Sequence, residues 1–145
     1  MINRPVLLDV NIPMYAAGRP HVYRDSCVKV MTEVAEGRLS AAIDTESIQE
    51  ILYRYGALRQ WSTATSLACS LLDLVDTVYP ILPSDAALTI ELFERYAPKG
   101  VTARDLVHVA VMKSHGLAEI VSTDSHFDLV DGIRRLDPAE MCQDA

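Results

Sequence analysis

Short apolar runs of strand length alternate with longer stretches of helical periodicity along most of the chain. The first two runs both end beside an acid, Asp9 after the first and Asp44 after the second. Pro80 falls inside the third run and favours an edge position or a bulge, because proline donates no hydrogen bond to a sheet. The predicted strands are residues 5–9, 39–43, 77–82, 119–122 and 133–136.

Between these runs, apolar residues recur at the spacing of one helix face. The stretch 45–56 shows it in Ile48, Ile51 and Tyr55. The last long stretch, 102–115, is apolar on almost every side, which predicts a buried helix. We expect helices at 23–36, 45–56, 61–75, 84–96 and 102–115, with Ser84 and Thr102 as N-caps and short helical turns at 14–16 and 128–130.

This alternation predicts an α/β fold in which a mostly parallel sheet carries helices on both faces. We expect a single domain over 1–145, with a core from about residue 5 to about residue 138. The polar tail beyond the core is expected to fray. The sequence shows no internal repeat and no linker.

Composition narrows the class of protein. The apolar run before Asp9 is too short for a signal peptide and no run has membrane length, so we expect a soluble, cytoplasmic protein without membrane association. Cys27, Cys69 and Cys142 form no metal or disulfide pattern, and the first two are expected to be small core residues. The net charge of −7 disfavours broad capture of nucleic acid but suits a cation site or a basic partner.

Acids gather where the predicted topology brings chain segments together. Asp9, Asp44 and Asp124 follow strands, and Glu50 and Asp105 lie in the first turns of helices that begin at the same sheet edge. Carboxylates that converge without compensating Lys or Arg repel one another, and a divalent cation relieves that repulsion. Oxygen ligands favour Mg²⁺ or Mn²⁺ over zinc.

Each acid also has a structural interpretation. Thr102 and Asp105 have the spacing of a capping box, and Glu50 precedes Arg54 at the spacing of a helix ion pair. Asp124 is suited to capping the turn after its strand. Asp9 gains nothing from the core, so structural and functional roles are evenly matched there. The cation-site hypothesis therefore rests on the convergence of these acids and not on any one of them.

Four segments together resemble the PIN-domain family, and within it the VapC-type toxins of type II toxin–antitoxin modules. The similarity extends from about residue 6 to about residue 138, in matching order and separation. The segments are Val6-Leu7-Leu8-Asp9-Val10-Asn11, Gln49-Glu50-Ile51-Leu52, Ala103-Arg104-Asp105-Leu106-Val107-His108 and Ser122-Thr123-Asp124-Ser125-His126-Phe127-Asp128.

The resemblance implies a three-layer α/β/α sandwich and a metal-dependent endoribonuclease that cuts single-stranded or loop RNA, such as tRNA or rRNA. It implies an acidic quartet that binds Mg²⁺ or Mn²⁺, with Asn11 and Thr123 as polar neighbours. It also implies inhibition by a VapB-like antitoxin, and we expect a homodimer. The quartet positions in this sequence are Asp9, Glu50, Asp105 and Asp124.

Charge distribution suggests where RNA and protein partners bind. Residues 60–94 contain no Lys or Arg, so this stretch is a poor RNA surface. We expect the helices around 48–72 to form the antitoxin groove or a dimer surface, with Tyr55, Leu58 and Trp61 as anchors, although core packing suits these three equally well. The side chains expected to guide phosphates are Arg19, Arg24, Lys99, Arg104 and Lys113.

Two other classes of protein remain open. One is an Asp-dependent phosphotransferase phosphorylated on Asp9, which the absence of a second Asp in Asp9-Val10-Asn11 disfavours. The other is a catalytically idle PIN-like module that binds RNA or protein. His108 is interpreted as a hydrogen-bonded helix histidine and His126 as an exposed turn residue, and neither has a Ser or Cys partner for nucleophilic catalysis.

Overall fold

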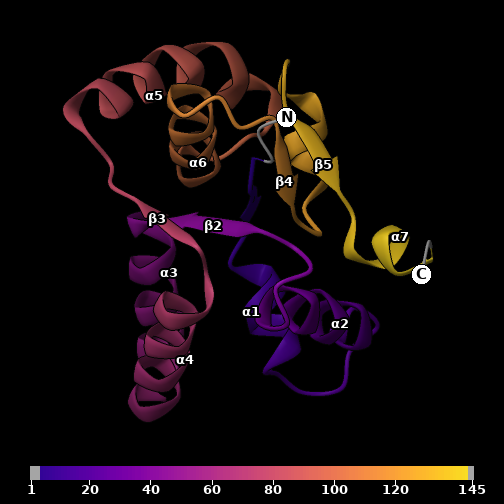
Figure 1. Ribbon diagram of the computed structural model, residues 1–145. Coiled ribbons are helices and arrows are strands. Elements are labelled where there is room, and N and C mark those ends of the chain that lie inside the picture. The colour runs from indigo at the N-terminus through magenta and orange to yellow at the C-terminus, as the bar shows by residue number, and fades with distance from the viewer. Residues whose placement is uncertain (1–3, 144–145) are drawn as a thin grey trace.

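A parallel five-stranded sheet with the order β3-β2-β1-β4-β5 forms the centre of the molecule (Figure 1). The computed structural model describes residues 4–143. The first predicted strand is shorter than expected and stops before Asp9, and the third is an edge strand, as Pro80 indicated. The strands are β1 (Val6–Leu8), β2 (Ala41–Asp44), β3 (Thr77–Tyr79), β4 (Glu119–Val121) and β5 (Arg134–Leu136).

Helices cover both faces of this sheet, so the three-layer α/β/α architecture is confirmed. α5 and α6 lie on one side of it and α1 and α2 on the other, while α3 and α4 form a hairpin that projects beyond the strands (Figure 1). The helices are α1 (Asn11–Ala16), α2 (Arg24–Ala35), α3 (Thr45–Ala57), α4 (Trp61–Leu74), α5 (Pro83–Tyr96), α6 (Ala103–Ser114) and α7 (Pro138–Gln143), with 3-10 turns η1 (Ala97–Lys99) and η2 (Ser125–Leu129).

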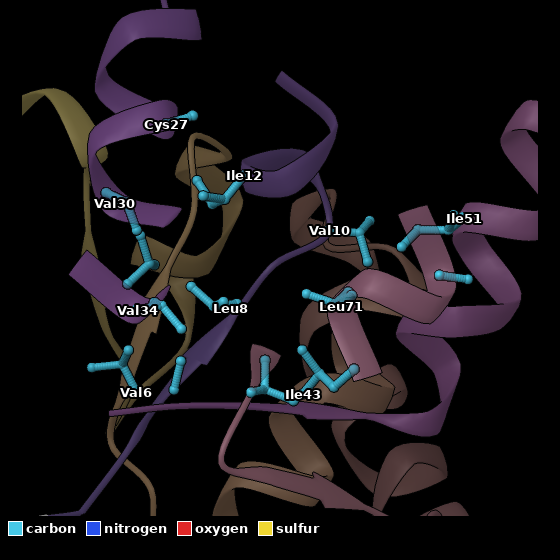
Figure 2. Packing of buried hydrophobic residues seen from close by; sticks show 14 residues of the cluster. Val6, Leu8, Val10, Ile12, Cys27, Val30, Val34, Ile43, Ile51 and Leu71 are labelled. Atoms are coloured by element: carbon cyan, nitrogen blue, oxygen red, sulfur yellow. The ribbon is translucent and has the colours of Figure 1, made fainter. Parts of the chain in front are cut away.

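Successive residues of the central strand supply two separate cores. Leu8 packs with α1, α2, α3 and α4 in the cluster that Figure 2 shows, whereas Leu7 packs with α5 and α6 on the opposite face. This follows from the two-residue period of a strand, which sends neighbouring side chains to opposite faces. The expected burial of the last long helix is confirmed, since Leu106, Val109 and Met112 of α6 are fully buried.

The strand order reverses direction beside β1. The chain runs from β1 outward through β2 to β3, and β4 and β5 then add on the other side of β1. Neighbouring connections therefore depart in opposite directions at the carboxyl ends of β1 and β4, which is where open α/β sheets bind ligands. Asp9 and Ser122 directly follow these two strands, and the Asp9 N–H donates to Val121 O at 3.0 Å.

Three further expectations about the fold were wrong. The tail does not fray over Pro138–Gln143, because this segment forms α7 and packs on α2, with Met141 against the core. Leu82, and not Ser84, is the N-cap of α5, and the Leu82 N–H donates to Asp85 Oδ2 at 2.8 Å. Cys69 is exposed on α4, whereas Cys27 is buried as expected.

The part of the chain that the structure describes contains no helix that is both long enough and apolar enough to cross a membrane.

Candidate active site

Two side chains hold Asp9 at the carboxyl edge of the sheet. It follows β1 and is 7% exposed. The Ser122 hydroxyl donates to Asp9 Oδ2 at 2.6 Å, and the Asn11 amide donates to the same oxygen at 3.2 Å. Because both side-chain donors act on one oxygen, they fix the orientation of the carboxylate.

Ser122 is a site residue that the sequence interpretation missed. Its side chain is fully buried, and besides donating to Asp9 its oxygen accepts the Asp124 N–H at 2.9 Å. The hydroxyl therefore connects the loop after β4 to the acid after β1. The signal that was available is a polar side chain ending the apolar run 119–122.

Glu50 lies on α3 and is 4% exposed. Its Oε1 accepts a hydrogen bond from Arg104 Nη1 at 2.8 Å and lies 3.7 Å from Arg54 Nη2. The expected ion pair with Arg54 is thus present, but the expectation of acids without a compensating Lys or Arg was wrong for this oxygen. The other oxygen, Oε2, is buried and has no hydrogen-bond partner within residues 4–143.

Asp44 and His108 form a fully buried pair beside these acids. His108 Nδ1 lies 2.6 Å from Asp44 Oδ2, so His108 is the hydrogen-bonded helix histidine that the sequence indicated. The second ring nitrogen, Nε2, is buried and has no partner within the described residues. Asp44 Oδ2 is therefore held by a histidine, while Asp44 Oδ1 is buried and has no hydrogen-bond partner within the described residues.

Three of these side chains converge closely. One ligand atom from each of Asp9, Glu50 and His108 lies within 4.8 Å of the other two. Asp105 and Asp124 stand outside that tight group and are half-buried. The structure thus brings two of the four expected acids together with a histidine, and places the other two at the margin.

Asp124 shows the structural role that the sequence allowed. Asp105 shows only half of the expected capping box, because no bond from the Thr102 N–H to the Asp105 carboxylate is present within residues 4–143. Thr102 caps α6 and its hydroxyl accepts the Asp105 N–H at 3.2 Å. Asp124 caps η2, where its Oδ1 accepts the His126 N–H at 2.9 Å and lies 2.8 Å from His126 Nδ1. Within residues 4–143 the Thr123 hydroxyl makes no hydrogen bond, and its side chain is half-buried.

The electrostatics reflect several acids held in a small volume. Burial raises the pKa of Asp9 most strongly, while the His108 charge and the Ser122 hydrogen bond act against that rise. Burial, followed by the charges of Asp9 and Asp124, raises the pKa of Asp105 to about 6. Burial opposes protonation of His108, but its bond to Asp44 and the surrounding carboxylates outweigh burial and raise its pKa to about 9.

The donor set fits a divalent cation. A buried oxygen without a hydrogen-bond partner is costly to maintain, and within residues 4–143 the Glu50 carboxylate oxygen Oε2 and the Asn11 amide oxygen Oδ1 are both in that position. Oxygen donors of this kind are the ligands that hard divalent cations take. Burial is the largest cause of the raised pKa values of Asp9 and Asp105, and a bound cation would favour the charged forms of both acids.

Comparison with known proteins agrees with this geometry. The family model described as the PIN domain matches residues 6–133. Ribonuclease VapC13 of Mycobacterium tuberculosis is 32% identical over 131 residues, which cover 90% of this chain and 98% of VapC13. Ribonuclease VapC7 of the same organism is 31% identical over 128 residues, which cover 87% of each chain.

Solved structures show the same fold. FitAcB from Neisseria gonorrhoeae matches with a TM-score of 0.71 at 17% identity, over 92% of this chain and 98% of that one. VapC20 of Mycobacterium tuberculosis, described as a sarcin-ricin loop cleaving toxin, matches with a TM-score of 0.73 at 13% identity, over 86% and 93%. The chain belongs to the PIN-domain family, and within that family to the VapC ribonucleases of toxin–antitoxin modules.

Proposed function

We propose that this protein is a metal-dependent endoribonuclease of a toxin–antitoxin module. The observation that supports this most directly is the convergence of buried Asp9 and Glu50 at the carboxyl edge of the sheet, where Glu50 keeps one oxygen without a partner. A buried acid of that kind suits a cation far better than it suits the core. The ribonuclease names of the VapC relatives support the same reaction class.

The residues proposed to hold Mg²⁺ or Mn²⁺ are Asp9, Glu50, Asp105 and Asp124, directly or through water. When bound, the cation supplies a water of lowered pKa and charge stabilisation for the phosphodiester oxygens. Mg²⁺ usually keeps several waters and takes only a few carboxylates, so the two half-buried acids need not contact it directly.

Other residues of the chain position this set. Ser122 and Asn11 hold one oxygen of Asp9, which fixes the direction in which its other oxygen points. Arg104 holds Glu50 Oε1, so in this structure its guanidinium is engaged with an acid and is not free to guide phosphate. Thr123 is proposed to orient a ligand or the attacking water, because its half-buried hydroxyl follows Ser122.

The proposed substrate is single-stranded or loop RNA, such as tRNA or rRNA. Exposed cations on the loops and helix ends would hold its phosphates, and we assign this role to Arg19 and Lys99, which are exposed. Lys113 is less suited to it, because its Nζ already donates to Asp131 O at 3.0 Å.

We propose the α3–α4 hairpin as the surface that an antitoxin or a second copy of the chain covers. Leu58 is 66% exposed and Trp61 is 61% exposed, so neither packs in the core of this chain. Large apolar side chains in solvent are typical of interaction sites. Solved relatives from Klebsiella pneumoniae and Salmonella typhimurium are described as a toxin–antitoxin complex and as DNA-bound VapBC.

The nuclease assignment is tested by incubating total cellular RNA with purified protein free of antitoxin, in Mg²⁺, Mn²⁺ or EDTA. Wild type should give discrete fragments that EDTA abolishes, and Asp9→Asn and Asp124→Asn should lose roughly 100-fold or more of that cleavage, since each removes a proposed ligand. Asp73→Asn is the matched control, because Asp73 is an exposed acid on α4.

Equal cleavage by wild type and the site variants would contradict the proposal and indicate a contaminating nuclease. Phosphate incorporation at Asp9 from a small phosphodonor would instead support a phosphotransferase. RNA binding without cleavage, unchanged in Asp9→Asn, would indicate a binding module.

A further inference from the structure

His108 has the surroundings of a metal ligand. Its Nδ1 is bonded to Asp44, so Nε2 is the nitrogen that remains available. That nitrogen is buried and has no hydrogen-bond partner within residues 4–143, and the side chain is 1% exposed. A buried ring nitrogen without a partner is costly unless a ligand completes it.

His108 lies beside two buried acids. Ligand atoms of Asp9, Glu50 and His108 all lie within 4.8 Å of one another, and Glu50 contributes a second buried atom without a partner, Oε2. Glu50 of α3 and His108 of α6 therefore belong to one small group, and each of them keeps a buried atom without a partner within the described residues.

Asp44 holds the other ring nitrogen of His108. A histidine that binds a metal commonly bonds its other ring nitrogen to a carboxylate, which fixes the ring and makes it a better ligand. Asp44 Oδ2 stands 2.6 Å from Nδ1 and is itself fully buried at the end of β2. The His108 Nδ1 bond is therefore made by Asp44, and not by Asp9 or Glu50.

We propose that His108 Nε2 is a ligand of the divalent cation held by Asp9 and Glu50, with Asp44 as its positioning residue. The inference rests on the proposed metal-nuclease function and adds a nitrogen donor to a site otherwise made of oxygens. Imidazole suits first-row transition ions, whereas Mg²⁺ prefers oxygen and water. The site should therefore bind Mn²⁺ in clear preference to Mg²⁺.

The test is pulsed electron paramagnetic resonance on protein loaded with stoichiometric Mn²⁺ at mildly alkaline pH, where a proton competes less for the ring. Wild type should show coupling of Mn²⁺ to a ¹⁴N nucleus. His108→Gln should lose this coupling and bind Mn²⁺ roughly 10-fold or more weakly in calorimetry, with a smaller change for Mg²⁺. Asp44→Asn should weaken Mn²⁺ binding about 10-fold.

His126 provides the matched control, because its Nδ1 lies 2.8 Å from Asp124 Oδ1 at the margin of the same site. The coupling should persist in His126→Gln. A triple variant in which His21, His115 and His126 are all replaced by Gln leaves His108 as the remaining histidine of the four in the chain. Coupling in that variant decides the question even if His108→Gln does not fold.

The outcomes separate this inference from the function on which it rests. Tight Mn²⁺ binding without ¹⁴N coupling, or coupling lost in His126→Gln but kept in His108→Gln, would overturn the histidine ligand and leave the nuclease proposal standing. Wild type that binds no Mn²⁺ and behaves like Asp9→Asn in calorimetry would overturn both.

Discussion

Two buried aspartates show what distinguishes a structural acid from an acid of the candidate site. Asp85, at the start of α5, is 1% exposed, and Asp9, after β1, is 7% exposed. Asp85 accepts the Leu82 N–H at 2.8 Å on one oxygen and the Ser114 hydroxyl at 2.5 Å on the other. Both oxygens are thus satisfied within the fold. The two donors of Asp9, in contrast, share a single oxygen.

The pKa values of the two groups move in opposite directions. Hydrogen bonds from Ser114 and Leu82 lower the pKa of Asp85, whereas burial raises the pKa of Asp9. The two ends of α6 show the same contrast. Ser114, the last residue of the helix, donates a hydrogen bond to Asp85. Asp105, in the first turn, has a pKa raised to about 6. Burial alone therefore does not mark a site.

The largest effect on stability is expected at Asp85. Asp85→Ala removes the acceptor of the Leu82 N–H and one acceptor of the Ser114 hydroxyl, and should lower the free energy of unfolding by about 2 kcal/mol. RNA cleavage per folded molecule should not change. Urea denaturation monitored by circular dichroism measures the first quantity, and a loss below about 0.5 kcal/mol would refute the structural role of this acid.

The pH dependence of the Asp85 contribution has a definite sign. Because its folded pKa lies below the unfolded value of 3.8, its stabilisation is present above that value and is lost as pH falls through the folded pKa. Asp85→Asn, which keeps an acceptor oxygen, should cost less than Asp85→Ala.

Asp105 should behave in the opposite way. Its pKa rises from 3.8 to about 6 on folding, so between these values the folded protein binds more protons than the unfolded one. The stability of metal-free protein should therefore fall as pH rises through this window. Asp105→Asn should flatten that dependence and raise the melting temperature at neutral pH by about 3 °C, on the order of 1 kcal/mol.

Calorimetric melting of metal-free wild type and Asp105→Asn across that pH range provides the measurement. Added Mn²⁺ should stabilise wild type more than the variant, since ligand binding to the folded state adds stability. A variant less stable than wild type at neutral pH in EDTA would show that Asp105 contributes to the fold through contacts that outweigh the repulsion.

The smallest effect is expected at Ser122. Ser122→Ala removes one of the two donors to Asp9 Oδ2, but Asn11 still donates to that oxygen. RNA cleavage should fall about threefold, or about 0.7 kcal/mol, through poorer orientation of Asp9. The pKa of Asp9 should rise further, because the lost hydrogen bond lowers it. The fall in cleavage should therefore be larger in acidic buffer, which a pH profile of the two proteins measures.

The sequence determined the architecture and the position of the edge acids. A two-residue period in the apolar runs and a helical period between them suffice for an α/β sandwich, because each pattern specifies which face is buried. Parallel strands share the edge at which they end, so Asp9 and the loop after β4, which carries Asp124, come to the same edge without any further information. The family resemblance relied on the same short segments. The folding of α7 escaped this reasoning, because its packing on α2 depends on contacts distant in sequence.

Only the tertiary structure decided how each polar atom is satisfied. Asp44 and His108 are 64 positions apart, Asp9 and Ser122 are 113 apart, and Arg104 reaches Glu50 across 54 positions. No periodicity encodes these pairs, because they depend on how α3, α6 and β4 pack around β1 and on rotamers that packing selects. The sequence could therefore place the acids at one edge. Only the folded chain shows which of their atoms are hydrogen-bonded and which buried atoms, such as Glu50 Oε2, have no partner within residues 4–143.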